Sequence, residues 1–367
     1  MKVALVHELL TMRGGAERVL RVFAEMFPDA PIYTFLYDER VLGDWFPRER
    51  VRVSRLQKTA WASHNHHRYL PFFPSAAEAW DFSEYDLVLS SSSAFAHGIL
   101  TNGKPVHVCY VHSPARYLWD RTHDVLSGGN PIRRLLASRL FHRLRVWDAE
   151  AAERADVLVA PSHTVRQRIE RYWRREAQVI PPPIDDRWLQ GALPDSPGSY
   201  LLIASTLAPY KRLDLAVRAC SQAGLPLKIA GDGADAARLR SLAGPTVEFL
   251  GYQDGDALQN LYRNASAVLF PGDEDFGLVP LEALATGRPV VAFKAGGATE
   301  TLTEGVHGTF FDEPTPESLL GAVRRLETLA IDPAALRTHA SAYSTARFRK
   351  SMTDVLDRAL EGSTLAT

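Results

Sequence analysis

Two glutamates eight positions apart frame the segment Asp273-Glu274-Asp275-Phe276-Gly277-Leu278-Val279-Pro280-Leu281-Glu282. The apolar run before this segment predicts a buried strand over Ala267–Phe270. Pro280 is typical of the first turn of a helix, where its missing N–H has no partner to lose. The segment is therefore predicted to lead from a strand, through an acidic loop, to a helix N-terminus.

A helix N-terminus leaves backbone N–H groups without partners, so those of Phe276, Gly277 and Leu278 are expected to face an anion. Glu274 and Glu282 are expected to accept hydrogen bonds from neutral hydroxyls. Phosphate on the N–H groups and hydroxyls on the carboxylates is the chemistry of a nucleotide sugar. The alternative is a solvated acidic loop, with Glu282 placed to complement the helix dipole.

A basic pair, Lys211-Arg212, follows another predicted strand, after Ser205-Thr206-Leu207-Ala208-Pro209-Tyr210. Both cations are predicted at the start of a helix, where positive charge is unfavourable for the helix dipole. A bound diphosphate would explain them, and two solvated surface charges are the alternative.

Three further features lie at predicted strand ends. Gly15, in Gly14-Gly15-Ala16-Glu17-Arg18, opens a helix after the first strand and suits a loop that approaches phosphate. Gly251-Tyr252 offers backbone groups and a ring to a base, and His112 offers its imidazole to a sugar hydroxyl. The alternatives are an ordinary helix start, a tight turn and a structural histidine.

These residues need parallel strands to position them, and the chain alternates short apolar runs with helical patterns, as parallel α/β sheets do. The predicted strands of the first half are Lys2–Val6, Ile32–Phe35, Leu87–Ser90, His107–Val111 and Val157–Ala160. Those of the second half are Tyr200–Ala204, Leu227–Ala230, Val247–Leu250, Ala267–Phe270, Val290–Ala292 and Thr309–Phe311. Pro181-Pro182-Pro183 cannot lie within a helix or a central strand. The domains are therefore predicted over 1–185 and 198–344, with a last helix from 345.

The composition excludes several classes of protein. The 367 residues are enough for two domains, and 46% hydrophobic with 23% charged residues is ordinary for a soluble globular protein. A formal net charge of −1 argues against a general nucleic-acid binder. With only Cys109 and Cys220, a disulfide framework is not expected. No apolar run approaches the ~20 residues of a membrane span, so a cytoplasmic location is expected.

Two basic segments have open interpretations. Arg133, Arg134, Arg139, Arg143 and Arg145 share a helical pattern with leucines. Such a helix either lies on an anionic membrane, at the inner face of the plasma membrane, or has one face in the core and a solvated basic face; the second interpretation is favoured. The histidines of Ser63-His64-Asn65-His66-His67 match no standard zinc spacing and are interpreted as a polar loop.

On these residues, the chain resembles the retaining nucleotide-sugar glycosyltransferases of family 4, which have the GT-B fold of two facing Rossmann-like domains. The two-glutamate segment and Gly296-Gly297-Ala298-Thr299-Glu300 are similar to the family's donor-site motifs. The segments from His7, from Tyr110 and from Pro209 are most similar to bacterial O-antigen and exopolysaccharide mannosyltransferases, which use GDP-mannose.

The resemblance implies a role for each residue. Glu282 would hold the donor ribose, and Glu274 the hydroxyls of the transferred sugar. Lys211 and Gly15 would meet the diphosphate, and His112 would contact the sugar near the reacting carbon. No metal or other cofactor is implied, the acceptor would be a saccharide or a polyprenyl-diphosphate-linked saccharide, and the last helix would cross back onto the first domain.

The chain departs from the family at Ser205 and Thr206, where a Gly-Arg pair is usual and the arginine clamps the diphosphate. Arg212 or another cation then substitutes, or donor binding is weakened, or the chain is no competent transferase. Since Lys211 and both glutamates remain, an active enzyme is expected. The alternatives are a GT-B epimerase acting on a UDP-sugar and an inactive subunit that binds a nucleotide sugar.

Overall fold

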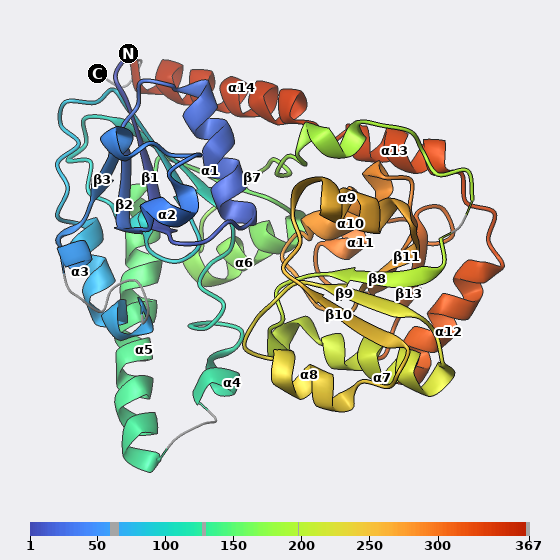
Figure 1. The fold of residues 1–367 in the computed structure, drawn as a ribbon. Helices are drawn as coiled ribbons and strands as arrows, with labels where there is room; N and C mark the ends of the chain where they lie inside the picture. Colours follow the sequence, from blue (N-terminus) through green and yellow to red (C-terminus); the bar gives the residue numbers. More distant parts are fainter. Residues whose placement is uncertain (59–65, 127–129, 197, 365–367) are drawn as a thin grey trace. The chain divides into compact units, whose positions relative to one another are not determined.

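A computed structural model describes residues 1–58, 66–126, 130–196 and 198–364 (Figure 1). The chain forms two compact units, and each is described by itself. The first unit comprises Met1–Pro181 and Phe348–Thr367, and the second comprises Pro182–Arg347. The chain thus passes from one unit to the other within the predicted proline connector.

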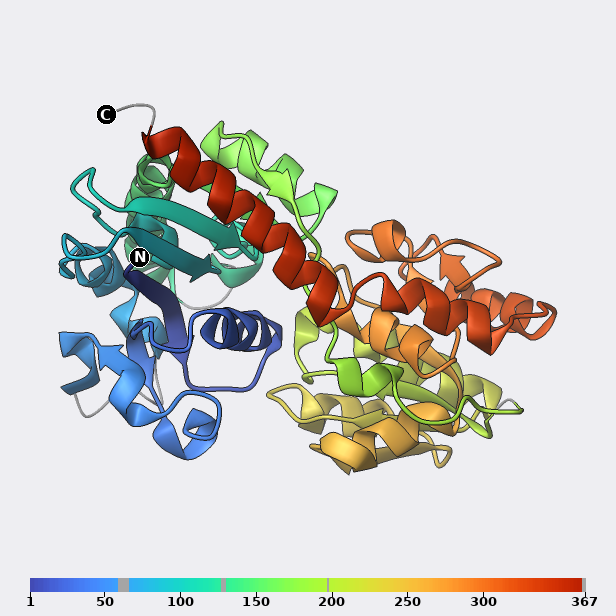
Figure 2. The same ribbon diagram turned by 90° about the horizontal axis from the view of Figure 1, so that it is seen from above.

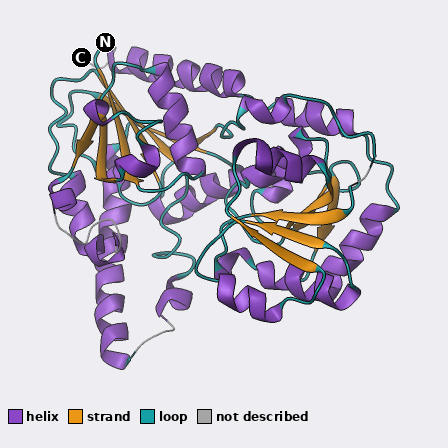
Figure 3. Cartoon of the chain, in the orientation of Figure 1, coloured by secondary structure: helices purple, strands orange, loops and turns teal. Residues whose placement is uncertain are grey.

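The first unit is built on a seven-stranded parallel sheet in the order β3-β2-β1-β4-β5-β6-β7. Its strands are β1 (Val3–Leu10), β2 (Ile32–Tyr37), β3 (Val51–Val53), β4 (Leu87–Ser92), β5 (Val106–Val111), β6 (Val157–Ala160) and β7 (Gln178–Val179). Its helices are α1 (Gly15–Met26), α2 (Glu39–Leu42), α3 (Phe73–Ala77), α4 (Thr122–Leu126), α5 (Pro131–Ala151) and α6 (His163–Trp173). Figure 3 shows helices around these strands.

Both faces of the first sheet are buried because its strands are apolar at successive positions. Along β1, Leu5 packs into the cluster that α1 and the last helix cover, whereas Val6 packs into a cluster on the other side. The last helix, α14 (Thr345–Thr364), inserts Phe348 and Met352 into the first of these clusters. The Phe348 ring stacks on Phe23 of α1 at 5.7 Å. Figure 2 shows α14 over the strands.

The second unit is built on a six-stranded parallel sheet in the order β10-β9-β8-β11-β12-β13. Its strands are β8 (Tyr200–Ala204), β9 (Leu227–Ala230), β10 (Val247–Gly251), β11 (Ala265–Phe270), β12 (Val290–Phe293) and β13 (Gly308–Phe311). Its helices are α7 (Leu213–Ala223), α8 (Ala236–Leu242), α9 (Gly255–Arg263), α10 (Leu278–Ala285), α11 (Ala298–Thr301), α12 (Pro316–Glu327) and α13 (Pro333–Ser341). The α/β class predicted from the sequence is confirmed.

The predicted elements differ from the observed ones mainly at their ends. The short edge strands β3 and β7 were absent from the prediction, because three and two residues give too little periodic pattern to detect. The helix expected from Lys211 begins at Leu213. The histidine cluster around His64 lies in or beside the range 59–65, outside the residues whose side chains are described. Among the helices described, none is long and apolar enough to cross a bilayer.

Candidate active site

In the second unit, the two predicted charged segments meet. Lys211 ends a short 3-10 turn, Pro209–Lys211, after β8, and Glu274 follows the adjacent strand β11. Lys211 Nζ lies 2.5 Å from Glu274 Oε1, and the two side chains are only 15% and 21% exposed. They line a small hollow with Ser205 and Gly272. Parallel strands end at one edge of a sheet, which is where ligands bind in such folds.

The glycine loop predicted to face an anion has the expected geometry. Gly277 has φ of +82°, and a Cβ there would lie 2.8 Å from the Phe270 ring, so only glycine fits. Gly277 is the N-cap of α10. In the described part of the chain, the N–H groups of Phe276, Gly277 and Leu278 donate to no acceptor. Three donors at one helix end suit a phosphate or a sugar oxygen.

The second glutamate, Glu282, is 4% exposed and lies in the second turn of α10. Its Oε2 accepts a hydrogen bond from the Tyr262 hydroxyl at 3.1 Å. A buried carboxylate needs such donors, and Tyr262 was not expected from the sequence. Tyr262 belongs to α9, so a second helix orients Glu282.

Two loops hold these segments from the side. Gly297 donates its N–H to the Glu274 carbonyl at 2.9 Å, and a Cβ on Gly297 would lie 2.3 Å from the Phe276 Cα. The backbone of 296–297 therefore packs directly on the acidic loop. Leu207 donates to the Asp232 carbonyl at 2.9 Å, which ties the loop after β8 to the loop after β9.

Arg212 differs from the prediction. It precedes α7 in the left-handed conformation, with φ of +53°, instead of opening the helix. Its Nε lies 3.3 Å from Asp214 Oδ1, so its charge is already paired. Thr206, in the loop after β8, is exposed. The geometry gives Arg212 a local partner, and it gives no direct support to a substitute diphosphate clamp.

Gly251 and Tyr252 lie at the end of β10, two strand positions from β8. Gly251 has φ of +70° and accepts a hydrogen bond from the Gly231 N–H at 2.7 Å, so it makes a tight turn. Tyr252 is 64% exposed. Neither residue contacts the Lys211–Glu274 pair through any interaction of the described residues, and their role towards a base stays a prediction.

In the first unit, His112 follows β5 and is joined to a buried hydrogen-bonded chain. The register pairs His7 of β1 with Ser91 of β4. Ser91 Oγ lies 2.8 Å from His112 Nε2 and 3.1 Å from His7 Nδ1. The other side of His7, Nε2, lies 3.6 Å from Glu17 Oε1.

The two histidines of this hydrogen-bonded chain, His7 and His112, have pKa values shifted in opposite directions. Burial lowers the pKa of His7, but the hydrogen bond and charge of Glu17, with the charge of Glu8, outweigh burial and raise it overall. Burial, together with the positive charge of His7, lowers the pKa of His112 to about 4. The surroundings therefore favour the charged form of His7 and the neutral form of His112.

The adjacent Glu8 holds the loop after β4. Its buried carboxylate accepts hydrogen bonds from the Ser92 hydroxyl at 2.8 Å and from the N–H groups of Ser93, Ala94, Phe95 and Ala96 at 2.8–3.0 Å. Burial raises the pKa of Glu8, but the charge of His7 and the backbone donors lower it below its usual value. The acid is thus a structural anion inside a nest of N–H groups.

Gly15 begins α1 and is exposed, and the N–H of its neighbour Gly14 donates to Glu17 Oε2 at 2.9 Å. Glu17 therefore joins the glycine loop to the chain that ends at His112. His7, Glu8, Glu17 and Ser91 were not expected at the site from the sequence. The available signals were a glutamate three residues after Gly14, which is the capping-box spacing, and an acid at the end of a buried strand.

Two family-wide sequence profiles match the chain. The profile of the glycosyl transferases group 1 matches residues 186–344, and that of Glycosyltransferase Family 4 matches residues 13–188. The chain belongs to these GT-B glycosyltransferases.

Relatives of this glycosyltransferase match parts of the sequence. A D-inositol 3-phosphate glycosyltransferase of Acidothermus cellulolyticus is 30% identical over 214 residues, 49% of this chain and 48% of the relative. A GDP-mannose-dependent alpha-mannosyltransferase of Mycobacterium tuberculosis is 40% identical over 98 residues, 26% of each. The matched region thus spans about half of these curated relatives or less.

Solved structures match almost the whole glycosyltransferase. Anabaena HepE in complex with UDP-glucose is 18% identical, with a TM-score of 0.73 over 98% of this chain and 100% of that one. The sucrose-phosphate synthase of Thermosynechococcus elongatus is 16% identical, with a TM-score of 0.70 over the same shares. At these identities the likeness shows the fold, and it confirms the predicted GT-B architecture.

Proposed function

We propose that this protein transfers a sugar, mannose from GDP-mannose as first choice, to a saccharide or a lipid-linked saccharide during polysaccharide biosynthesis. The observation that carries the proposal is the Lys211–Glu274 pair at the ends of β8 and β11, beside three N–H groups at the start of α10. A cation and N–H donors suit a diphosphate, and a carboxylate suits sugar hydroxyls.

Within this proposal the second unit binds the donor and the first unit serves the acceptor. Lys211 turns from Glu274 towards the diphosphate, and Glu274 then takes the sugar hydroxyls. Glu282, fixed by Tyr262, holds the ribose hydroxyls. His112 contacts the transferred sugar, and Gly15 meets the diphosphate from the first unit.

The proposed reaction retains the configuration of the sugar and uses no metal. The bond from the anomeric carbon to the phosphate oxygen breaks, and the acceptor oxygen bonds to the same face of that carbon. The acceptor proton passes to the leaving phosphate, whose charge Lys211 and the N–H groups stabilise. Turnover that persists in excess EDTA supports this proposal, and turnover restored only by manganese or magnesium contradicts it.

The donor is tested by thermal shift with GDP-mannose, GDP, UDP-glucose and UDP, because a bound donor raises stability by mass action. The partial match to a GDP-mannose-dependent enzyme favours guanine, whereas the UDP-glucose complex of a structural neighbour keeps uracil in the comparison. A stabilising shift with GDP and none with UDP supports the first choice. The reverse result moves the donor to UDP-sugars.

Turnover then separates the alternatives. A transferase consumes donor only with an acceptor, an epimerase converts a UDP-sugar without one, and an inactive subunit binds donor without product. The Ser205-Thr206 departure favours the last of these. The intact pair of Lys211 and Glu274 favours the transferase.

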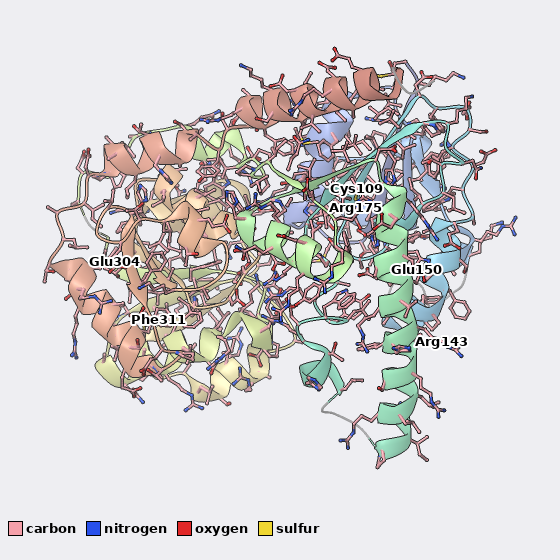
Figure 4. The ribbon with its side chains drawn as sticks, turned by 180° about the vertical axis from the view of Figure 1, so that it is seen from behind. Cys109, Arg143, Glu150, Arg175, Glu304 and Phe311 are labelled. Carbon is pink, nitrogen blue, oxygen red and sulfur yellow. The ribbon has the colours of Figure 1, made fainter. Side chains whose placement is uncertain are left out.

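A lipid-linked acceptor would bring the enzyme to a membrane, and α5 has a surface that fits one. Ile132, Leu135 and Leu136 are 70%, 54% and 59% exposed. They recur with Arg139 and Arg143 at steps of three and four, so these five side chains share one side of the helix. Figure 4 shows Arg143 on α5, between Glu150 and the beginning of the helix.

This side is opposite to the one that packs in the core. Phe141 and Leu144 are buried, and nine residues, about two and a half turns, separate Ile132 from Phe141. The later turns of α5 thus have one face in the core, as the favoured interpretation expects, whereas Leu135 and Leu136 of the first turns lie outside it. Between Pro131 and Trp147 there are five arginines and no acid. We infer an anionic lipid surface as the partner of this apolar and basic face.

Vesicle sedimentation tests this contact. Vesicles containing phosphatidylglycerol should bind the protein, and pure phosphatidylcholine vesicles should bind it less. The variant Leu135→Ser/Leu136→Ser and the variant Arg139→Gln/Arg143→Gln should each lose binding. Arg218→Gln/Arg324→Gln, which removes two exposed arginines of the second unit, is the matched control. Equal binding by all variants would contradict the proposed contact.

A further inference from the structure

The buried chain from Glu17 to His112 connects two predicted donor-site features of the first unit. Glu17 receives the N–H of Gly14 with one oxygen and faces His7 with the other. His7 Nδ1 lies 3.1 Å from both the carbonyl oxygen and the hydroxyl oxygen of Ser91. The same hydroxyl lies 2.8 Å from His112 Nε2. Ser91 is 0% exposed, so water does not compete at its hydroxyl.

The single proton of the Ser91 hydroxyl makes this chain directional. When His7 is charged, both of its nitrogens donate, and Nδ1–H points at the Ser91 oxygens. The Ser91 hydroxyl must then donate to His112 Nε2, so the neutral His112 carries its proton on Nδ1. A neutral His7 gives the same direction, because the Ser91 carbonyl can only accept and therefore favours a proton on His7 Nδ1. The direction depends on the Ser91 hydroxyl, which is the hydrogen-bond partner of His112 Nε2.

We propose that Ser91 sets the tautomer of His112: its carbonyl keeps the proton of His7 on Nδ1, and its hydroxyl therefore donates to His112 Nε2. In this assignment His112 presents an N–H donor at Nδ1, and it does not present a base. Nδ1 of His112 has no hydrogen-bond partner within the described residues. It is therefore available to an acceptor atom of a ligand, such as a hydroxyl or phosphate oxygen.

The charges around His7 support the charged form. Glu8 lies next to it on β1, Glu17 faces it from α1, Ser91 adjoins it on β4, and His112 reaches it from the end of β5. Two acids thus act on His7, in accordance with its raised pKa. Glu17, His7 and Ser91 are positioning residues, whereas His112 is the residue that meets the ligand.

Nitrogen-15 NMR of the histidine rings tests the tautomer without any substrate. In the wild-type protein, His7 should be protonated at Nδ1, and His112 should have a protonated Nδ1 with a bare Nε2. His7→Gln and His112→Gln assign the two rings. In Glu17→Gln the pKa of His7 should fall, but His112 should keep its proton on Nδ1, because the glutamine N–H then faces His7 Nε2 and leaves the His7 proton on Nδ1.

Glu17→Gln is suited to this purpose because glutamine also accepts the Gly14 N–H, so the cap of α1 is kept. Ser91→Ala is the second variant, and it should leave His112 as a mixture of both tautomers. Glu25→Gln, an exposed glutamate of the same helix, is the control and should change neither ring. A His112 tautomer that stays the same in Ser91→Ala, or a wild-type His112 protonated at Nε2, would overturn the proposal.

The catalytic consequence rests on the proposed transferase. Ser91→Ala should lower kcat by about twofold or more, since His112 then presents an acceptor to developing charge in part of the molecules, and the donor KM should change less. If the tautomer switches and the wild-type protein shows no transfer, the proposed function fails and the assignment of His112 stands. If transfer occurs and the tautomer does not respond, the assignment fails alone.

Discussion

The two units present chemically active residues in opposite ways. In the second unit, the candidate site is a partly exposed pair, Lys211 and Glu274, carried by loops at the ends of β8 and β11. In the first unit, His112 is the outer end of a buried network of His7, Glu17 and Ser91. The same kind of parallel sheet thus supports a charged anion site in one case and a tuned neutral imidazole in the other.

The difference shows that the effect of removing a charged group depends on how deeply the group is buried. A partly exposed pair keeps some hydration, so its removal acts mainly on ligand binding. A buried carboxylate such as Glu8 depends on its hydrogen bonds, so its removal acts mainly on folding. Substitutions in the two units should therefore separate activity from stability.

The largest effect is expected for Lys211→Ala. A charge-assisted bond to phosphate contributes ~1.5–3 kcal/mol, and the developing charge on the leaving phosphate should add to it. Turnover should fall by at least about a hundredfold, and calorimetry should show weaker GDP binding. Stability should change little.

Lys294→Ala is the matched control for Lys211→Ala, because Lys294 also pairs with an acid, Asp312, and is 58% exposed. Its turnover should equal that of the wild-type protein. If Lys211→Ala lowers stability but does not alter GDP affinity, the Lys211–Glu274 pair is structural. The proposed contrast between the two units is then wrong.

Glu8→Gln should act on stability. Its carboxylate receives the Ser92 hydroxyl and four N–H groups, and an amide would turn one donor of its own towards them. The free energy of unfolding should fall by about 2–4 kcal/mol in denaturant titration. Glu84→Gln, an exposed glutamate beside Lys2, should have almost no effect.

The pH dependence of stability sharpens this prediction. The lowered pKa of Glu8 gives stability that is present above its unfolded pKa and is lost as pH falls through the folded value. The raised pKa of His7 gives stability that is present below about 6.5 and is lost as pH rises through its folded value. Glu8→Gln should therefore remove the loss of stability that Glu8 causes at low pH. If the stability of this variant still falls at low pH as in the wild-type protein, the lowered pKa of Glu8 is contradicted.

The same contrast explains what the sequence revealed. The segment from Glu274 to Glu282 is local, so strand, loop, glycine and helix start were visible as one pattern, and the fold followed from alternating elements. His7 and Ser91 lie 84 positions apart and meet only through the register of β1 and β4. Register over such a separation leaves no local pattern, and the conformation of Arg212 depends on a loop with no periodicity.

Glu282→Ala should have a smaller effect than Lys211→Ala. Paired ribose hydroxyls would lose a charged acceptor contributing ~1.5–3 kcal/mol, and GDP affinity should fall at least several-fold in calorimetry. Tyr262→Phe removes only the orienting hydroxyl, so it should weaken GDP by less. Affinity that is unchanged in Glu282→Ala would remove this glutamate from the donor site.

The smallest effect is expected at the position that departs from the family. Thr206→Arg adds a cation to the loop after β8 and should tighten GDP binding, by less than the ~1.5–3 kcal/mol of a well-placed charge-assisted bond because the loop is exposed. Arg212→Ala should change GDP affinity little, since Arg212 already pairs with Asp214 at 3.3 Å.

A double-mutant cycle of Thr206→Arg and Arg212→Ala distinguishes the two accounts of the missing clamp. Independent effects mean that Lys211 is the main phosphate ligand and that the Arg212–Asp214 pair is a feature of the α7 start. A strong loss in Arg212→Ala that Thr206→Arg rescues means that Arg212 leaves Asp214 for the diphosphate when donor binds. In that case the second unit, like the first, positions its charge through an internal partner. The two units then differ only in how deeply their charged groups are buried.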